Sequence, residues 1–448
     1  MNRKITLIFS MILLLAASCV REDAMGSQQN QDLSVSALAQ KSINTSEDAV
    51  QGTLVVLLDE KAADALAQGQ SVAALTQACE QSGATMQRAF TYSGTERERQ
   101  NRMHRWFLLN FPTDMNVEDV AAVFAELDEV SAVQYNTEVK RMEEGKATEW
   151  VAGDNSVAPL LPFNDPKLID QWHYINNADL SVASTVRAGA DINVRDAWKL
   201  TTGDPAIIVA VCDEGVKYDH PDLKDNMWVN EKEKNGKEGV DDDGNGFVDD
   251  VHGYNFLSTY NVATGEGELM PVNWTREGDS GHGTHVAGTV AARNNNGIGV
   301  AGVAGGDGTP DSGVRIMTCQ LFSGNASCGT MNRAQAYKYA ADNGASIIQC
   351  SFGQDAGAVS SDASFEANYS FEYDAINYFM TNKAASNPVS GNFAIFATGN
   401  DGKEVAGYPA AHYKYIGVSA FGPDYLPTSY TNYGPGTNIS APGGDYAI

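Results

Sequence analysis

From about residue 191 onward, short continuous apolar runs alternate with stretches of helical periodicity. The runs expected to be strands are 206–212, 314–322, 346–350, 393–398 and 415–420. The stretches expected to be helices are 285–293, 332–343 and 365–381. Apolar strands separated by helices indicate a parallel sheet that is covered by helices on both faces. The sequence therefore predicts a three-layer, doubly wound α/β fold, with functional side chains just past the carboxyl ends of the strands.

A smaller unit is expected before this fold, at residues 51–141. Its strands are expected at 53–58, 105–111 and 130–135, and its helices at 62–82 and 117–127. The charged run 96–105 is expected to be a solvated loop. This β-α-β…α-β order fits a small α+β module of the ferredoxin-like kind. Residues 142–165 are polar and irregular, which is typical of a linker.

The first residues predict export. Arg3 and Lys4 precede an apolar run, 5–17, that is too short to span a bilayer. Small residues then stand directly before Cys19, which resembles the lipobox of bacterial lipoproteins, where that cysteine is lipidated. We therefore expect a lipoprotein signal peptide at 1–19, a flexible tether at 20–50 and attachment to a membrane of the bacterial cell envelope, periplasmic or at the cell surface. An ordinary signal peptide with a chance cysteine, giving a secreted protein, is the alternative.

The composition narrows the range of partners. The formal net charge is −27, which argues against a nucleic-acid partner, because phosphate binding needs a basic face. The cysteines form no CxxC pair, so neither a zinc motif nor a redox motif is indicated. Cys212, Cys319 and Cys350 lie in strand-like runs and are expected to be buried free thiols. A disulfide between Cys319 and Cys328 is the alternative.

Two sequence stretches point to catalysis. The strand 206–212 is followed by Asp213-Glu214-Gly215, and the string 282–288, HGTHVAG, begins a predicted helix. These stretches resemble the Asp and His signatures of subtilisin-like serine proteases (subtilases). The resemblance implies that Asp213 is the orienting acid and His282 the general base. The family usually has Thr or Ser at the position of Glu214, and a second carboxylate there is expected to raise the pKa of the base.

Two further stretches match the same family. The residues Ser351-Phe352-Gly353 follow the strand 346–350 and resemble the extended segment that pairs with the substrate backbone and lines the specificity pocket. Asn400, at the end of the run 393–400, resembles the asparagine that stabilises the oxyanion. The resemblance thus implies a peptide or protein substrate.

The nucleophile is the departure from the family pattern. Subtilases carry it in a Gly-Thr-Ser-Met-Ala string after the Asp and His signatures, and that string does not occur here. Residues 438–448 resemble the stretch that precedes it, so we expect a serine endopeptidase that is truncated before its serine and inactive as given. The alternative is a naturally short pseudoprotease that binds peptides or inhibits. Ser280, in a Gly-Asp-Ser-Gly string, lies only two positions from His282 and is expected to be a loop residue.

An acidic segment, 240–250, indicates a metal site. Asp241, Asp243, Asn245 and Gly246 match positions 1, 3, 5 and 6 of a calcium-binding loop. Further expected ligands are the carbonyl oxygen of Phe247 and a carboxylate from Asp249 or Asp250. His252 stands at position 12, where an EF-hand has glutamate. The segment therefore predicts an EF-hand-like half loop that holds a structural calcium ion, with an acidic solvated loop as the alternative.

The role of the first unit follows from its position. It precedes the domain expected at 166–448, and its end, 133–138, resembles the tail of the family's inhibitory propeptide. The resemblance implies a module that packs on the enzyme in cis, lays its tail in the active-site cleft and assists folding. An accessory domain unrelated to inhibition is the alternative.

Overall fold

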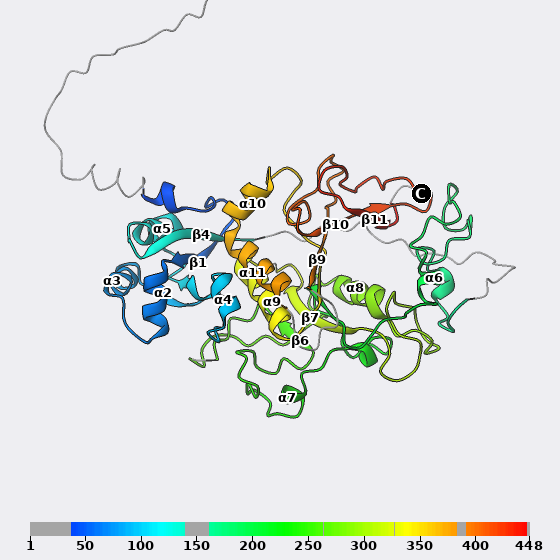
Figure 1. Ribbon diagram of the computed structural model, residues 1–448, viewed down its shortest axis with the longest axis horizontal. Helices are drawn as coiled ribbons and strands as arrows, with labels where there is room; N and C mark the ends of the chain where they lie inside the picture. The colour runs from blue at the N-terminus through cyan, green and yellow to red at the C-terminus, as the bar shows by residue number, and fades with distance from the viewer. Residues whose placement is uncertain (1–36, 139–160, 263, 327, 383–390, 446–448) are drawn as a thin grey trace, which may run out of the picture.

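The computed structural model describes residues 37–138, 161–262, 264–326, 328–382 and 391–445. They form two units that pack against each other (Figure 1). The predicted signal peptide with Cys19 and most of the predicted linker lie outside the described residues. Within these residues no helix has both the length and the apolar character needed to cross a bilayer.

The first unit is a four-stranded antiparallel sheet with helices on one face. Its strand order is β2-β3-β1-β4, which is the order of a ferredoxin-like fold, as the sequence predicts. The strands are β1 (Ala49–Leu58), β2 (Thr85–Arg88), β3 (Trp106–Asn110) and β4 (Val130–Thr137). The helices are α2 (Glu60–Ala67), α3 (Ala73–Ser82), α4 (Glu96–Gln100), the 3-10 helix η1 (Met103–Arg105) and α5 (Val117–Ala125). The stretch 62–82 is thus two helices, and β2 is an additional strand.

Two local expectations for this unit were wrong. The unit begins before residue 50, because Ile43 N–H donates to Val133 O at 2.8 Å and the Asn44 side chain bonds the backbone of Tyr135. The tether is therefore shorter than 20–50. The charged run is not a loop but contains α4. Thr95 and Glu98 cap the N-terminus of this helix with a reciprocal capping box.

The second unit is built on a seven-stranded sheet in which every pair is parallel. The strand order is β11-β10-β9-β8-β5-β7-β6. The strands are β5 (Ile208–Glu214), β6 (Gly253–Asn255), β7 (Arg315–Phe322), β8 (Ile347–Cys350), β9 (Phe393–Ala397), β10 (Ile416–Phe421) and β11 (Ile439–Pro442). The sequence predicted five of them, and the short strands β6 and β11 are additional.

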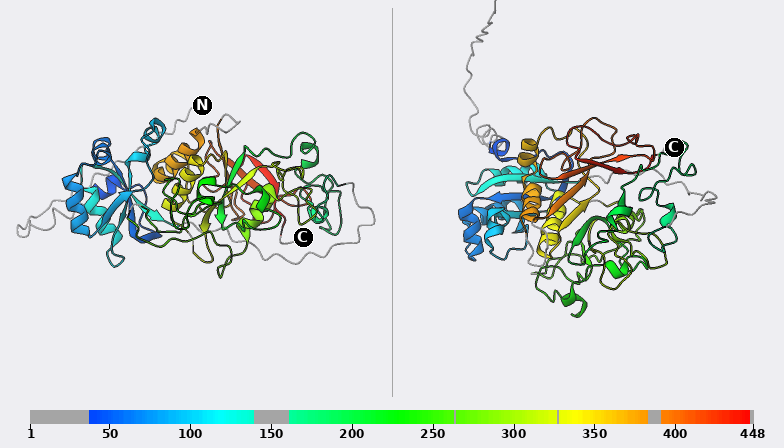
Figure 2. Two further views of the ribbon diagram at one scale, coloured as in Figure 1. Left: turned by 90° about the horizontal axis from the view of Figure 1, so that it is seen from below. Right: turned by 45° about the vertical axis from the view of Figure 1, so that its right-hand side comes forward.

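Helices cover both faces of this sheet, which confirms the predicted three layers (Figure 2). On one face α8 packs its alanines on valines of β5. On the other face α9 and α11 pack on alternate residues of β5, β7, β8 and β9. The helices are η2 (Leu168–Asp170), α6 (Val194–Ala197), η3 (Lys224–Asn226), α7 (Glu231–Lys234), α8 (His282–Ala291), α9 (Thr330–Asp342), α10 (Asp362–Asn368) and α11 (Ser370–Thr381).

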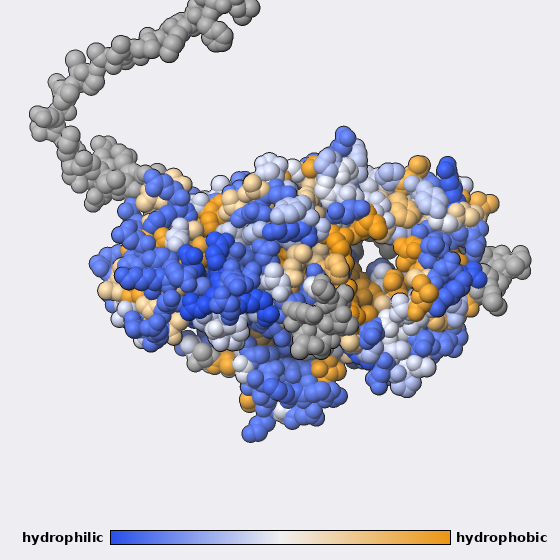
Figure 3. Space-filling view, viewed as in Figure 1, coloured by the Kyte–Doolittle hydropathy of each residue, from blue (hydrophilic) through white to orange (hydrophobic). Residues whose placement is uncertain are grey.

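Among the described residues, only half of the α8 face of the sheet is covered. Towards β11, the residues on this face are exposed or partly buried: Phe393 is 46% exposed and Ile439 58%. On the opposite face Ala394 and Phe396 are buried. Figure 3 shows a hollow with hydrophobic walls in this region, between β10, β11, α8 and α6. We call the exposed residues Phe393 and Ile439 and the partly buried residues Ile395 and Val418 the open half-face.

The first unit packs on α9 and α11 through an apolar core, in which Phe90 and Trp106 contact the ring of Phe371, and through buried polar pairs. Trp106 of β3 donates its indole N–H to Asp374 of α11 at 2.8 Å, and Arg102 pairs with the same carboxylate at 2.8 Å. Lys338 of α9 pairs with Glu98 at 3.2 Å. Burial raises the pKa of Asp374, although Arg102 and Trp106 oppose this effect. The carboxylate of Asp374 is therefore stabilised in its buried position by groups of the first unit.

Candidate active site

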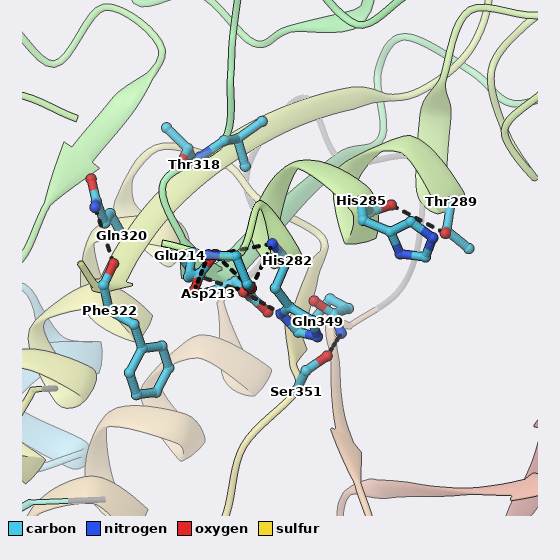
Figure 4. A network of polar contacts seen from close by, with 12 residues as sticks. Asp213, Glu214, His282, His285, Thr289, Thr318, Gln320, Phe322, Gln349 and Ser351 are labelled. Carbon is cyan, nitrogen blue, oxygen red and sulfur yellow. Dashed lines mark hydrogen bonds and ion pairs between the residues drawn. The ribbon is translucent and has the colours of Figure 1, made fainter. Parts of the chain in front are cut away.

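Asp213 and His282 meet where β5 ends and α8 begins. The Nδ1 atom of His282 lies 2.6 Å from Oδ1 of Asp213 (Figure 4). The side chain of Asp213 is 2% exposed, whereas that of His282 is 16% exposed. The structure thus brings together the two residues that the sequence predicted as acid and base, and it leaves the imidazole accessible from one side.

The hydrogen-bond geometry decides which ring nitrogen carries the hydrogen. An ionised carboxylate can only accept, so Nδ1 of His282 is the donor to Asp213. The neutral imidazole then has its lone pair on Nε2, where a general base needs it. Asp213 Oδ1 also accepts the backbone N–H of Glu214 at 2.7 Å, which fixes the carboxylate. This pair can therefore take up a proton at Nε2 and stabilise the resulting imidazolium.

The glycines around His282 allow the helix to approach the strand closely. Gly281 has φ 81°, a left-handed conformation, and it is the residue directly before α8. A Cβ atom on Gly283 would lie 2.2 Å from the backbone oxygen of Glu214. The Thr284 hydroxyl accepts the backbone N–H of Lys217 at 2.9 Å. Because of these contacts, the start of α8 has little room to move relative to the end of β5.

Glu214 interacts with the backbone of the loop and helix that carry His282. Its carboxylate accepts the backbone N–H of His282 at 2.9 Å and the backbone N–H and hydroxyl of Ser280 at 3.2 Å. Ser280 is therefore a loop residue, as predicted. The sequence identified Glu214 only as an additional charge, and it gave no signal for these backbone contacts.

The predicted substrate-binding residues lie beyond the end of β8. Cys350 pairs with Cys212, so Ser351 follows β8 at the level where Asp213 lies in β5. Its hydroxyl accepts a hydrogen bond from Gln349 at 2.7 Å. The side chain of Phe352 is 1% exposed and packs against the rings of Phe322 and Phe396. Only the backbone of Phe352 is thus left for a substrate, and Gly353 is partly exposed.

Asn400 lies at the same edge of the sheet as Asp213. It follows β9 by three residues, and it is exposed. The carboxyl ends of parallel strands meet at one edge, so Asp213, Ser351 and Asn400 all lie there. The oxyanion role of Asn400 stays a prediction.

Part of the acidic segment forms a compact cluster of carboxylates. One oxygen each from Glu233, Asp241 and Asp243 lies within 4.8 Å of the others. Asp241 also accepts the backbone N–H groups of Gly244 and Gly246, both at 2.8 Å. Glu233, in α7, is the member that the sequence analysis missed, because it precedes the acidic run and its α7 position gives no metal signal.

The remaining predicted ligands have other contacts. Asp250 is buried and accepts hydrogen bonds from Asn230, Asn245 and Tyr339, and burial raises its pKa to about 6. Asp249 accepts the backbone N–H of Gly239 at 2.8 Å. The ring of Phe247 packs against three aromatic residues, Tyr254, Phe256 and Tyr339. Metal binding at this segment stays a prediction.

The cysteines agree with the prediction of buried free thiols. Cys212 pairs in register with Cys319 on one side and Cys350 on the other, and all three are fully buried. Cys319 and Cys328 are both free, so the alternative disulfide is not formed in this structure.

Comparisons with family models and with individual proteins point to the same family. The family model described as "Subtilase family" matches residues 204–447. The chain is 30% identical to halolysin of Haloferax mediterranei over 314 residues, which are 70% of this chain and 45% of halolysin. It is 27% identical to the thermophilic serine proteinase of Bacillus sp. (strain AK1) over 347 residues, 75% of this chain and 69% of that protein. It spans less than half the length of the first curated relatives that it matches.

The fold is similar to that of solved proteases. The crystal structure of fervidolysin from Fervidobacterium pennivorans, described as a keratinolytic enzyme related to subtilisin, superposes with a TM-score of 0.51. The sequence identity is 18%, and the match covers 88% of this chain and 47% of that chain. At this identity the likeness shows the fold, which is the subtilisin-like α/β fold that the sequence predicted.

Proposed function

The chain belongs to the subtilase family of serine proteases, and from this we propose that it is the precursor of a serine endopeptidase that hydrolyses peptide bonds through an Asp-His-Ser triad. The observation that carries the proposal is the 2.6 Å contact between His282 Nδ1 and Asp213 Oδ1. A buried carboxylate that orients an accessible imidazole is the acid–base half of such a triad.

The proposed reaction uses these groups in sequence. Nε2 of His282 accepts the proton of a serine hydroxyl as the oxygen attacks the peptide carbonyl carbon. Asp213 stabilises the imidazolium, and the Asn400 amide donates to the oxyanion of the tetrahedral intermediate. His282 then gives its proton to the leaving amine as the C–N bond breaks, and water, activated by His282 in the same way, hydrolyses the resulting acyl-serine ester and frees the serine. Asn400 is exposed just past β9, and Ser351 is partly exposed beside the strand that carries Asp213. These positions support a substrate that lies along this edge of the sheet.

We assign the serine to a segment outside these 448 residues. The open half-face supports this assignment. Apolar residues such as Phe393 and Ile439 line it, and a further helix would bury them, as α8 buries Val209 and Val211 on the same face. The chain of 448 residues is accordingly proposed to bind and orient a peptide without cleaving it.

We assign the first unit the role of an inhibitory propeptide. Glu138, at the end of β4, bridges Gly329 in an antiparallel manner, so this tail continues onto the second unit. Asn136 accepts the backbone N–H of Met331 at 3.2 Å, at the start of α9. These contacts support a tail that runs from β4 along the protease.

We further propose that the acidic segment binds a structural calcium ion. The approach of Glu233, Asp241 and Asp243 within 4.8 Å supports this, because calcium takes several oxygen ligands and neutralises their mutual repulsion. These three residues would hold the ion, and its charge would stabilise the loop between β5 and β6.

The proposed location is the bacterial cell envelope, after export. The support is the signal-like sequence at 1–17 and the small residues before Cys19, whose lipidation would attach the protein to a membrane. Secretion without a lipid anchor is the alternative.

A fluorophosphonate probe, which labels activated serines, tests the proposed activity. We expect no labelling of the 448-residue chain. A longer product of the same gene, freed of its first unit, should be labelled, and His282→Ala should abolish that labelling. Ser280→Ala in the longer product is the matched control and should still be labelled. A folded longer product that is not labelled would contradict the endopeptidase and favour a peptide-binding pseudoprotease.

A further inference from the structure

Glu214 is a buried carboxylate directly next to the proposed catalytic acid. It is 1% exposed, and it is the last residue of β5. Its oxygens accept hydrogen bonds from the backbone N–H groups of Ser280 and His282 and from the Ser280 hydroxyl. A buried anion needs such donors, because desolvation without them is costly. All of these donors belong to the segment that leads into α8.

Within its own segment, the start of α8 has one long capping hydrogen bond, from the N–H of His282 to the Ser280 hydroxyl oxygen at 3.3 Å. The residue before it is Gly281, which has no side chain to accept a hydrogen bond, and the first turn carries no acidic residue. The first N–H groups of a helix lack partners inside the helix, and they favour a negative charge. Glu214 supplies that charge from the neighbouring strand, through a 2.9 Å bond to the N–H of His282 itself.

Two consecutive residues of β5 therefore bond to His282, one to its side chain and the other to its backbone. Asp213 holds the imidazole at Nδ1, and Glu214 holds the backbone nitrogen. A side chain with a fixed ring contact still moves if its backbone moves, so both contacts are needed for a constant position. Gly283 lies so close to Glu214 that an added Cβ atom would be 2.2 Å from the Glu214 carbonyl oxygen, so the start of α8 packs directly on the end of β5.

We propose that Glu214 is a positioning residue for the general base: by capping α8 from β5, it keeps His282 in hydrogen-bonding register with Asp213. This inference rests on the proposed role of His282, because the cap matters for catalysis only if His282 is the base. Glu214 itself does not contact the substrate in this assignment.

The charged and titratable groups near this helix start include Lys217, whose backbone N–H donates to Thr284, and His285 in the first turn of α8. Asp213 lies on the same strand as Glu214, and Asp279 lies in the loop before α8, where its carboxylate accepts the backbone N–H of Gly324 and Arg276. On the neighbouring strand β7, the residue that pairs with Asp213 is the neutral Gln320. Replacing Glu214 by glutamine therefore removes the negative charge that bonds to the backbone N–H of His282.

The test uses the 448-residue chain and the proton NMR resonance of Nδ1–H of His282, which a short hydrogen bond to a carboxylate shifts strongly downfield. In Glu214→Gln we expect this resonance to broaden or move upfield, and the pH at which His282 titrates to fall. The amide of His282 should exchange with solvent at least tenfold faster. Glu98→Gln is the matched control, because Glu98 is also a buried helix-capping glutamate, 1% exposed, but lies in the first unit.

The outcomes separate the two proposals. An unchanged resonance and titration in folded Glu214→Gln would overturn the positioning role. If Glu214→Gln does not fold, Glu214→Ala takes its place with the same expected loss, because alanine has no side-chain acceptor for the N–H of His282. In the longer product, kcat should fall about tenfold with KM nearly unchanged. A longer product without peptidase activity, but with a resonance that responds to Glu214, would contradict the proposed function and leave the positioning role standing.

Discussion

At the scale of single residues, His173 is a largely buried imidazole outside the candidate site. It lines a cavity of about 390 Å³ together with His220 and His285. Burial, with a smaller contribution from His285, lowers the pKa of His173 to about 4. His173 is therefore neutral in the folded protein at a pH where the unfolded chain is already protonated.

This shift predicts acid sensitivity. The lowered pKa means that unfolding takes up a proton between pH 6.5 and about 4, so stability is lost as the pH falls through this window. We expect His173 to account for a loss of about 3 kcal/mol in the free energy of unfolding. Urea unfolding at pH 7.5 and pH 4.5 measures the loss, and His173→Gln should reduce it. An equal loss in the variant would contradict the assignment.

At the scale of elements, the docking of β3 on α11 depends on one shared carboxylate. Trp106→Phe keeps an aromatic ring beside Phe371 but removes the N–H that Asp374 accepts at 2.8 Å. We expect a loss of about 1–3 kcal/mol, because a buried acceptor is left without a donor. Hydrogen exchange of the whole chain should show weaker protection in β3 and α11. Trp172→Phe, outside this interface, is the control, and equal losses in both variants would argue against a specific role.

The acidic segment next to α7 gives a second prediction at this scale. If Glu233, Asp241 and Asp243 hold calcium, a chelator should lower Tm by several degrees, because the ion binds only the folded state. Asp243→Ala and Glu233→Gln should each reduce this shift. Asp311→Ala changes a carboxylate whose side chain is 93% exposed and should leave the shift intact. A chelator shift of the same size in all three variants would exclude this segment as the site.

The same elements show what could be predicted from the sequence. The strands β5, β7, β8, β9 and β10 are long or strongly apolar, and their pattern predicted them within a few residues. The strands β6 and β11 have three and four residues, too few for a pattern, and they form because a neighbouring strand offers unpaired backbone groups. The run 96–105 looks like a solvated loop because of its charges, yet Glu98 is buried by its pairing with Lys338, which lies far away in the sequence.

The residues of the candidate site also differ in how far the sequence alone predicts them. Asp213, His282 and Asn400 lie in motifs that predict their roles without a structure, and the structure brings Asp213 and His282 into contact. The motif places an acid near a base, but the contacts of Glu214 and the approach of Glu233 to the acidic segment depend on how separate segments fold together. Phe352 illustrates the opposite case, because its motif suggests a substrate contact whereas its side chain is part of the core.

At the scale of the whole molecule, the open half-face and the edge strand β11 determine how the chain behaves in solution. The 58% exposed Ile439 lies on β11, which ends the sheet and presents unpaired backbone groups. Like charges, from a net charge of −27, oppose contact between copies at low salt. Added salt screens this repulsion and leaves the apolar attraction in force.

The colloidal behaviour of the purified 448-residue chain should therefore depend on salt. We expect monomers at low ionic strength and reversible self-association as salt is added, together with binding of a hydrophobic dye. The double variant Phe393→Glu, Ile439→Lys should remain monomeric at the same salt, as measured by sedimentation velocity. A half-covered sheet thus makes ionic strength a variable that decides whether the chain stays in solution.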